Sequence, residues 1–209
     1  ISGLDWCVAN GMQVVNLSLG SSTDPGTTVK AAFDNAYASG LVVVASAGNS
    51  GAGADTVGYP AHYDSVIAVG STTSSDTLSS FSSTGPTVEV AAPGSSIYST
   101  LNGGGWGTMS GTSMASPHAT GVMALILAAG IEDADGNGRR NDEARWVLQS
   151  TCLDLGTTGR DNSFGFGLID AEAAVLLAYN PGGNPPPPAP IFNAPSNLVG
   201  TVNGSTVNL

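Results

Sequence analysis

Two spacings of apolar residues alternate along the first 180 positions of the chain. Short runs of β-branched and small residues, such as VVNLSLG at 14–20 and LVVVASAGNSG at 41–51, predict buried strands that end at glycine-containing turns. Elsewhere apolar residues recur every three or four positions, which predicts helices with one buried face. The predicted strands are 14–20, 41–51, 65–72 and 87–91, and the predicted helices are 2–10, 25–40, 112–130, 142–151 and 170–179.

This order of elements predicts an α/β domain built on a parallel sheet. Strands alternate with helices, and a helix is the usual connection between two parallel strands. The helix at 112–130 is apolar on most sides, so we expect it to lie in the core. Ser2 is expected to cap the first helix and Gly11 to end it.

The composition changes after residue 180. The string PGGNPPPPAP cannot form a helix or a central strand, because consecutive prolines lack N–H donors and favour an extended form. We therefore predict a domain at 1–180 and a Pro/Gly-rich linker at 181–194. Residues 195–209 alternate polar and apolar side chains around an Asn-Gly pair, which predicts the start of a truncated β domain. This last segment resembles the opening of a fibronectin type III module.

The charge of the chain excludes several kinds of partner. Sixteen acidic residues against 5 basic ones give a formal net charge of −11, which repels phosphate backbones and anionic membrane surfaces. We expect neither nucleic acid nor a membrane as partner, and no apolar run reaches the about 18 residues that span a bilayer. Two cysteines, Cys7 and Cys152, form no disulfide framework and no zinc spacing. The sequence leaves open whether they bridge each other, and we favour free thiols.

The segment GTSMASPH at 111–118 places Ser113 at the start of the predicted core helix. The first N–H groups of a helix have no partner within it, and the helix dipole favours negative charge beside them. A serine in this position can attack a carbonyl while its own N–H binds the resulting oxyanion. Pro117 is expected to fit because the first turn of a helix needs no N–H donors.

The ends of two predicted strands carry further groups that could bind a substrate. AGNSG at 47–51 carries Asn49 into an exposed turn, where a side-chain amide can donate to a developing oxyanion. NLSLG at 16–20 ends another strand, whose exposed backbone can pair with an extended peptide.

In this order and spacing, these segments closely resemble the subtilisin family of serine peptidases. The resemblance runs from Ile1 to about Tyr179 and also includes TVGYPAHYDSVIAVG, FSSTGPTVEVAAPG and FGFGLIDAEAA. It implies a three-layer α/β fold, with a parallel sheet flanked by helices. It also implies that residues 1–180 are a partial catalytic domain, truncated at its N-terminus.

The resemblance assigns roles to residues of this chain. It makes Ser113 the nucleophile. The oxyanion would be bound by the Asn49 side chain and the Ser113 N–H, with Thr112 next to them. The substrate-binding residues that it implies are Ser18, Leu19, Gly20, Ser46, Ala47, Gly48 and Gly58. Because Gly58 would form the base of the specificity pocket without a side chain, we expect a deep pocket that prefers large apolar or aromatic residues.

A serine peptidase of this type needs a His to take the serine proton and an Asp to orient that His. The chain contains only His62 and His118, and neither lies in a segment like the family's His-Gly-Thr-His. It also lacks an Asp-Thr-Gly or Asp-Ser-Gly triplet. In the family both segments precede the serine, so we expect them upstream of Ile1. We therefore expect this polypeptide alone to be inactive and less stable than the complete domain.

Two other functions fit parts of the sequence. An α/β-hydrolase also places a serine between small residues, and Gly111 to Ala115 nearly fits its motif, but the preceding GGGWGTMS is not a buried strand. A catalytically incomplete, peptidase-like binding module is the alternative that stays open, because the His and Asp are not in this chain.

Two cation sites are candidates. In DADGNGRRND at 133–142, oxygen-bearing Asp133, Asp135 and Asn137 alternate as in an EF-hand loop, with Gly138 at the sharp turn. The twelfth position is Ala144 where the motif has Glu, so a solvated loop before a helix is the competing interpretation. Separately, the family resemblance implies a cation at the backbone carbonyls of Ala61, Tyr63 and Val66.

We expect a serine endopeptidase that hydrolyses peptide bonds through an acyl-enzyme on Ser113. Its partners would be polypeptide substrates, and it would be a secreted monomer with a further C-terminal domain in the full-length protein. The chemistry requires no cofactor, and structural Ca²⁺ is the one ion considered. The resemblance also implies a signal peptide and a propeptide upstream.

Overall fold

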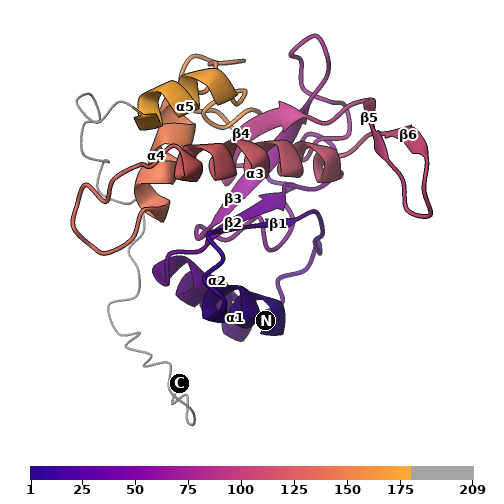
Figure 1. Cartoon of the computed structure of the whole chain (residues 1–209). Helices are drawn as coiled ribbons and strands as arrows, with labels where there is room; N and C mark the ends of the chain where they lie inside the picture. Colours follow the sequence, from indigo (N-terminus) through magenta and orange to yellow (C-terminus); the bar gives the residue numbers. More distant parts are fainter. Residues whose placement is uncertain (180–209) are drawn as a thin grey trace.

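The computed structural model describes residues 1–179, and the elements below belong to that range. The domain has three layers, with a central sheet between two groups of helices (Figure 1). The elements in chain order are α1 (Ser2–Ala9), β1 (Val14–Leu17), α2 (Thr27–Ala38), β2 (Val42–Ser46), β3 (Val66–Thr72), β4 (Val88–Pro93), β5 (Ile97–Thr100), β6 (Trp106–Met109), α3 (Thr112–Ala128), α4 (Asn141–Ser150) and α5 (Ala171–Tyr179).

The sheet is parallel and contains β1, β2, β3 and β4 in that order. Every residue of β2 and β3 is buried, as expected for strands that are covered on both faces. The order follows the sequence, so each strand pairs with the next one along the chain. The predicted α/β fold with a parallel sheet is therefore confirmed.

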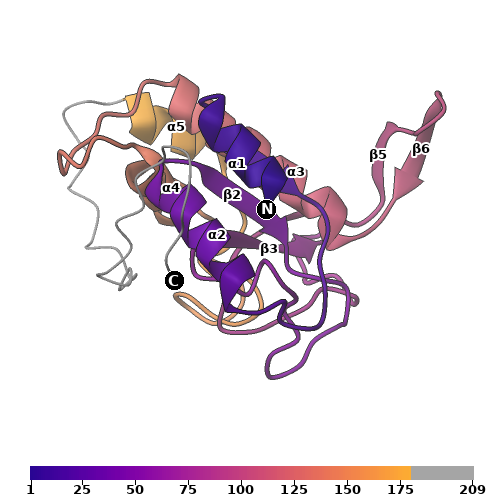
Figure 2. The same cartoon turned by 90° about the horizontal axis from the view of Figure 1, so that it is seen from below.

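Alternate residues of the strands serve two different cores. On one face, Val42 and Val44 of β2 pack with α3, α4 and α5; on the other, Val43 and Ala45 pack with α1 and α2. This division follows from the period of two in a strand, which sends successive side chains to opposite faces. Figure 2 shows α1 and α2 covering the second face, with α3 on the far side of the sheet.

Helix α3 is the central element of the first core. Its side chains Met123 and Ile126 are fully buried, and the helix contacts all four strands of the sheet as well as α4 and α5. Its N-cap residue, Gly111, has no side chain with which to cap the first helical residues, which begin at Thr112. The helix begins beyond the carboxyl ends of the strands, so the polar residues of its first turn lie at that edge of the sheet.

Three local expectations from the sequence need correction. Strand β1 is only half-buried, because it is the edge strand of the sheet within the described residues. The N-cap of α1 is Ile1 rather than Ser2, which is the first helical residue. The sequence predicted no strand between residues 91 and 112, but β5 and β6 pair there as an antiparallel hairpin that projects from the body (Figure 1).

A buried ion pair joins the sheet to the helices. Arg145 of α4 makes two hydrogen bonds to Glu89 of β4, and also donates to the Asp64 carbonyl at 2.9 Å. The guanidinium lies over the ring of Tyr37 of α2, 5.5 Å from its centroid. Burial by itself would lower the pKa of Arg145, but the adjacent Glu89 carboxylate outweighs it and raises the pKa. Arg145 therefore stays charged in the interior. The pattern of apolar residues in the sequence did not predict this buried ion pair.

The predicted linker at 181–194 and the predicted β domain at 195–209 lie outside the described residues and stay predictions. Within residues 1–179, none of the helices combines the length and the hydropathy needed to cross a bilayer.

Candidate active site

The turn that precedes α3 is fixed to the ends of β3 and β4. Gly111 donates its N–H to the Gly94 carbonyl at 2.8 Å, and Gly94 donates to the Thr72 carbonyl at 3.0 Å. A Cβ at position 94 would lie 2.7 Å from the Gly111 carbonyl oxygen, so only glycine permits this approach. The strand ends therefore hold the first turn of α3, which carries Ser113.

Asn49 is oriented by Thr112. The Asn49 Oδ1 accepts hydrogen bonds from the Thr112 N–H at 2.9 Å and from its hydroxyl at 3.0 Å. The Thr112 hydroxyl in turn accepts the Gly48 N–H at 3.1 Å. Because a backbone N–H can only donate, the atom facing Thr112 must be the amide oxygen, which leaves Asn49 Nδ2 free to donate elsewhere.

The free amide of Asn49 and the N–H of Ser113 flank the same point. A Cβ placed on Gly111 would lie 3.5 Å from Asn49 Nδ2 and 3.7 Å from Ser113 N. Asn49 is exposed and Ser113 is half-buried, so a ligand can reach both from solvent. Two N–H donors beside a serine hydroxyl at a helix N-terminus can stabilise an oxyanion formed by attack of that hydroxyl.

The predicted substrate-binding segments also come together at this edge of the sheet. Ser21 and Tyr59 exchange two backbone hydrogen bonds of 2.8 Å, which places Gly20 against the Tyr59 carbonyl. Gly58 donates to the Ala47 carbonyl at 2.9 Å, and a Cβ on Gly58 would lie 3.0 Å from the Ser21 carbonyl oxygen. Gly58 thus lies between Ser21, which follows the predicted substrate-binding strand 18–20, and Ala47 of the predicted pocket wall 46–48. Leu19 is 60% exposed, which leaves an apolar side chain open to a ligand.

A polar network between β1 and α3 was missed at the sequence level. Ser18 donates its hydroxyl to the Ser113 carbonyl at 2.8 Å and accepts from Asn16 Nδ2 at 3.0 Å. Asn16 Oδ1 accepts the hydroxyls of Ser116 at 2.7 Å and Thr120 at 3.2 Å. The signal that could have found it was an Asn within the apolar run VVNLSLG, since an amide on the inner side of a strand requires partners.

This network also corrects the expectation for Pro117. Pro117 lies in the sixth position of α3, beyond the first turn, and its missing N–H is the one that would bond to the Ser113 carbonyl four residues earlier. That carbonyl accepts the Ser18 hydroxyl instead. A proline in this position is therefore compensated from the sheet, and the compensation ties the turn of Ser113 to β1.

Neither histidine is hydrogen bonded to Ser113 within residues 1–179. His118 lies on α3 and binds the Met114 carbonyl through Nδ1 at 2.8 Å. His62 binds Asp55 through Nε2 at 2.9 Å, and its ring stacks on Tyr59 with 5.0 Å between centroids. A general base must lie within hydrogen-bond reach of the proton it removes. The described residues thus bring the Ser113 hydroxyl near two N–H donors but place no histidine in hydrogen-bond contact with it.

The two thiols are free, as predicted, and both are half-buried. Burial, followed by the nearby Glu89 and Asp170, raises the pKa of Cys152 to about 12, so this thiol is protonated at neutral pH and chemically inert.

The two candidate cation sites lie in different loops. Ala61, Tyr63 and Val66 are buried where the loop enters β3, and the Tyr63 carbonyl accepts the Val66 N–H at 2.9 Å; a cation at their carbonyls stays a prediction. Asp133, Asp135 and Asn137 lie in the loop after α3, at the opposite end of that helix from Ser113. With 17 residues in the helix, the two ends are about 24 Å apart.

Comparison with known proteins finds similarity to the subtilase family and to individual subtilisins. The model of the subtilase family matches residues 1–167. The chain is 47% identical to subtilisin DY of Bacillus licheniformis over 177 residues, which covers 84% of this chain and 61% of that protein. It is also 47% identical to subtilisin E of Bacillus subtilis (strain 168), covering 84% and 44%, and 43% identical to the minor extracellular protease Epr of the same strain, covering 86% and 27%. The matched region thus spans between 27% and 61% of the length of these three relatives.

The Thr112 hydroxyl is expected to contribute measurably to stability. In Thr112→Val the shape is kept, but the Gly48 N–H loses its acceptor and Asn49 loses one of its two donors. Leaving such groups unpaired costs about 1–3 kcal/mol, to be measured as the free energy of unfolding in urea. The matched control is Thr28→Val on the exposed surface of α2, which should change stability by less than about 0.5 kcal/mol. Equal stability of the two variants would contradict this account of Asn49.

Proposed function

The chain belongs to the subtilase family, and from this premise we propose that it supplies the nucleophile, the oxyanion donors and a substrate-binding wall of a serine endopeptidase. The observation that carries the proposal is the fixed orientation of Asn49, whose oxygen is held by Thr112 while its amine stays free beside Ser113. An amide with one end fixed and the other open is suited to bind a charge that develops during a reaction.

In the proposed reaction, the Ser113 hydroxyl attacks the carbonyl carbon of a peptide bond and its proton passes to a general base. The carbonyl oxygen becomes an oxyanion that accepts from Asn49 Nδ2 and the Ser113 N–H. Collapse of this intermediate breaks the C–N bond, and the base returns the proton to the leaving amine. Water then hydrolyses the ester on Ser113 by the same steps. The peptide itself lies in an extended form along residues 18–20.

The proposal places the general base and its orienting carboxylate on residues outside this 209-residue chain. Its support is that the described part of the chain brings neither His62 nor His118 to Ser113, while the relatives are considerably longer than the matched region. We further propose a polypeptide substrate and a monomeric, secreted enzyme. The net charge of −11 and the word "extracellular" in the name of one relative support secretion.

The longer protein that contains this chain should hydrolyse peptide bonds, and Ser113→Ala should abolish this activity. Asn49→Ala should lower kcat about 100–1000-fold with little change in KM, because the lost hydrogen bond forms only with the oxyanion. The assay is steady-state hydrolysis of a chromogenic peptide. Asn102→Ala, in the exposed loop of the β5–β6 hairpin, removes an amide far from the site and should leave kcat unchanged.

Two outcomes would refute the enzymatic proposal. One is a folded longer protein without peptidase activity that still binds peptides, which would establish the alternative of a peptidase-like binding module. The other is full activity in Ser113→Ala.

The 209-residue chain alone should have negligible reactivity at Ser113, because a serine hydroxyl without a base is a poor nucleophile. Incubation with phenylmethylsulfonyl fluoride followed by intact mass measurement should show no stoichiometric adduct. A complete subtilisin treated in parallel provides the positive control. Rapid labelling of the chain that disappears in Ser113→Ala would show that the described residues already hold a functional base.

The pocket between 46–48 and Gly58 should favour large apolar or aromatic residues immediately before the cleaved bond. Gly48 and Gly58 are partly exposed and carry no side chains, and none of residues 46–48 is charged, so the proposed pocket would admit a large apolar side chain and offer no charge to bind a basic one. A panel of peptides that differ only at this position should give the highest kcat/KM for Phe, Tyr and Leu. Fastest cleavage after Ala, Lys or Glu would contradict this specificity.

A further inference from the structure

The loop between α3 and α4 gathers carboxylates from both of its ends. Asp133 and Asp135 come from the start of the loop and Glu143 from the first turn of α4, and one carboxylate oxygen of each lies within 4.8 Å of the other two. Two ligand oxygens on opposite sides of a calcium ion are separated by about 4.8 Å, since each Ca–O distance is about 2.4 Å. The spacing therefore suits one shared cation.

The backbone of this loop is wrapped around Asp133. Asp133 accepts the N–H groups of Gly136 at 2.9 Å, Asn137 at 3.1 Å and Gly138 at 2.7 Å. Gly138, the sixth position of the EF-hand-like pattern, has φ +82°, which favours glycine at the sharp turn. The loop thus has a defined shape, although shape alone does not identify a ligand.

Glu143 provides the independent observation. Its side chain is only 3% exposed, and its carboxylate faces the loop, because Oε1 accepts the Ala134 N–H at 2.8 Å. The other oxygen, Oε2, is buried and has no hydrogen-bond donor among residues 1–179, while the Asp142 carboxylate lies close to the same side chain. Burying a carboxylate oxygen without a hydrogen-bond donor costs free energy of folding unless a cation or a proton binds to it.

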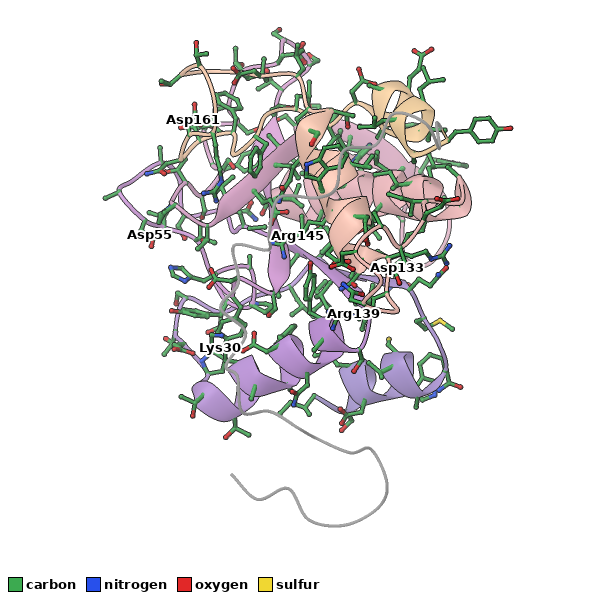
Figure 3. All side chains as sticks on the ribbon, turned by 90° about the vertical axis from the view of Figure 1, so that its left-hand side faces the viewer. Lys30, Asp55, Asp133, Arg139, Arg145 and Asp161 are labelled. Carbon is green, nitrogen blue, oxygen red and sulfur yellow. The ribbon has the colours of Figure 1, made fainter. Side chains whose placement is uncertain are left out.

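Protein cations do not neutralise this group of carboxylates. Within residues 1–179, none of the ion pairs involves Asp133, Asp135, Asp142 or Glu143. Arg139 is close to Asp133 in this loop (Figure 3), yet its side chain donates to Asn137 Oδ1 and to the Ala38 carbonyl. Arg140 reaches only the Ile131 carbonyl, at 3.5 Å.

We propose that the α3–α4 loop is a calcium site, with Asp133 and Asp135 as carboxylate ligands from the loop and Glu143 as the buried acidic ligand from α4. Asn137, predicted from the sequence as a further ligand, instead donates its Nδ2 to Asp135 and Asp142, and its Oδ1 accepts hydrogen bonds from Arg139. An all-oxygen donor set selects a hard cation, and a flexible loop with several carboxylates suits Ca²⁺ better than Mg²⁺, which prefers to keep its waters. The acidic residue that the twelve-residue pattern places at Ala144 is found one position earlier.

The bound ion would link α3 to α4 and steady the loop against α2. Arg139 and Asn141 already tie this loop to α2 through the carbonyls of Ala38 at 2.6 Å and Tyr37 at 2.9 Å. Two positions beyond Glu143 lies Arg145, which makes the buried pair with Glu89. Calcium would therefore stabilise the packing of α4 on the sheet. This inference does not depend on peptidase activity, because it concerns a loop about 24 Å from Ser113.

The test uses the 209-residue chain, freed of metal with EDTA, and follows calcium binding by titration calorimetry and the melting temperature by circular dichroism. Calcium should bind the unmodified chain and raise its melting temperature. Glu143→Gln and Asp135→Asn should each weaken binding at this site at least tenfold and remove most of the shift. Glu132→Gln removes an exposed charge beside the loop and should change the affinity by less than twofold.

The melting temperature of Glu143→Gln without metal shows whether Glu143 is a calcium ligand or only a structural residue. The Glu143→Gln side chain would keep an oxygen for the Ala134 N–H while losing the unpaired charge, so this variant without metal should be as stable as the unmodified chain or more so. A lower metal-free melting temperature, with an unchanged calcium shift, would show a structural role and overturn the proposal. Asp135 is exposed, so Asp135→Asn decides the matter if Glu143→Gln does not fold.

Two further results would also overturn the proposal. One is the absence of calcium binding and of any melting shift up to about 10 mM, beyond the range of weak extracellular sites. The other is calcium binding that both variants retain within twofold, which would place the ion elsewhere, such as at Ala61, Tyr63 and Val66.

Discussion

The packing of one apolar helix across the sheet is the constraint on which the other features depend. Helix α3 contacts every strand from β1 to β4 and both later helices, with Met123 and Ile126 fully buried. Because the helix is fixed along its whole length, its two ends are fixed as well. The first turn is held at the carboxyl ends of the strands, and the last turn leads into the acidic loop before α4.

At the first turn, polar contacts convert this packing into a defined site. The carbonyl of Ser113, left without a helical partner by Pro117, accepts the Ser18 hydroxyl, and Thr112 holds the oxygen of Asn49. Each contact joins segments far apart in the sequence. Their combined effect is that the serine, its N–H and a free amide are presented together, while the hydrophobic core alone would leave their relative orientation open.

Beyond the other end of α3, buried charged side chains of α4 contribute to the packing of the domain. In the buried ion pair of Arg145 and Glu89, each charge is neutralised by the other through direct hydrogen bonds. Glu143, two residues earlier on α4, is buried at least as deeply, but one of its oxygens has no hydrogen-bond donor within residues 1–179. The same helix thus carries one charge that the protein neutralises itself and one whose partner we propose to be an external cation. Both fix α4 against the rest of the domain.

The sequence by itself determined the α/β class, nearly all of the helices and strands, and the residues gathered at the strand ends, because these follow from local periodicity and from dense motifs around Ser113 and Asn49. It did not determine that Asn16 and Ser18 support the Ser113 turn, that Pro117 is compensated from β1, or that Glu143 rather than Ala144 faces the acidic loop. It also treated the edge strand β1 as fully buried and missed the β5–β6 hairpin. Those features depend on which side chains meet across long stretches of intervening sequence or on the position of a strand within the sheet. Only the packing of α3, α4 and the sheet decides such contacts, since a linear pattern records spacing along the chain and not the partner that a buried polar group finds.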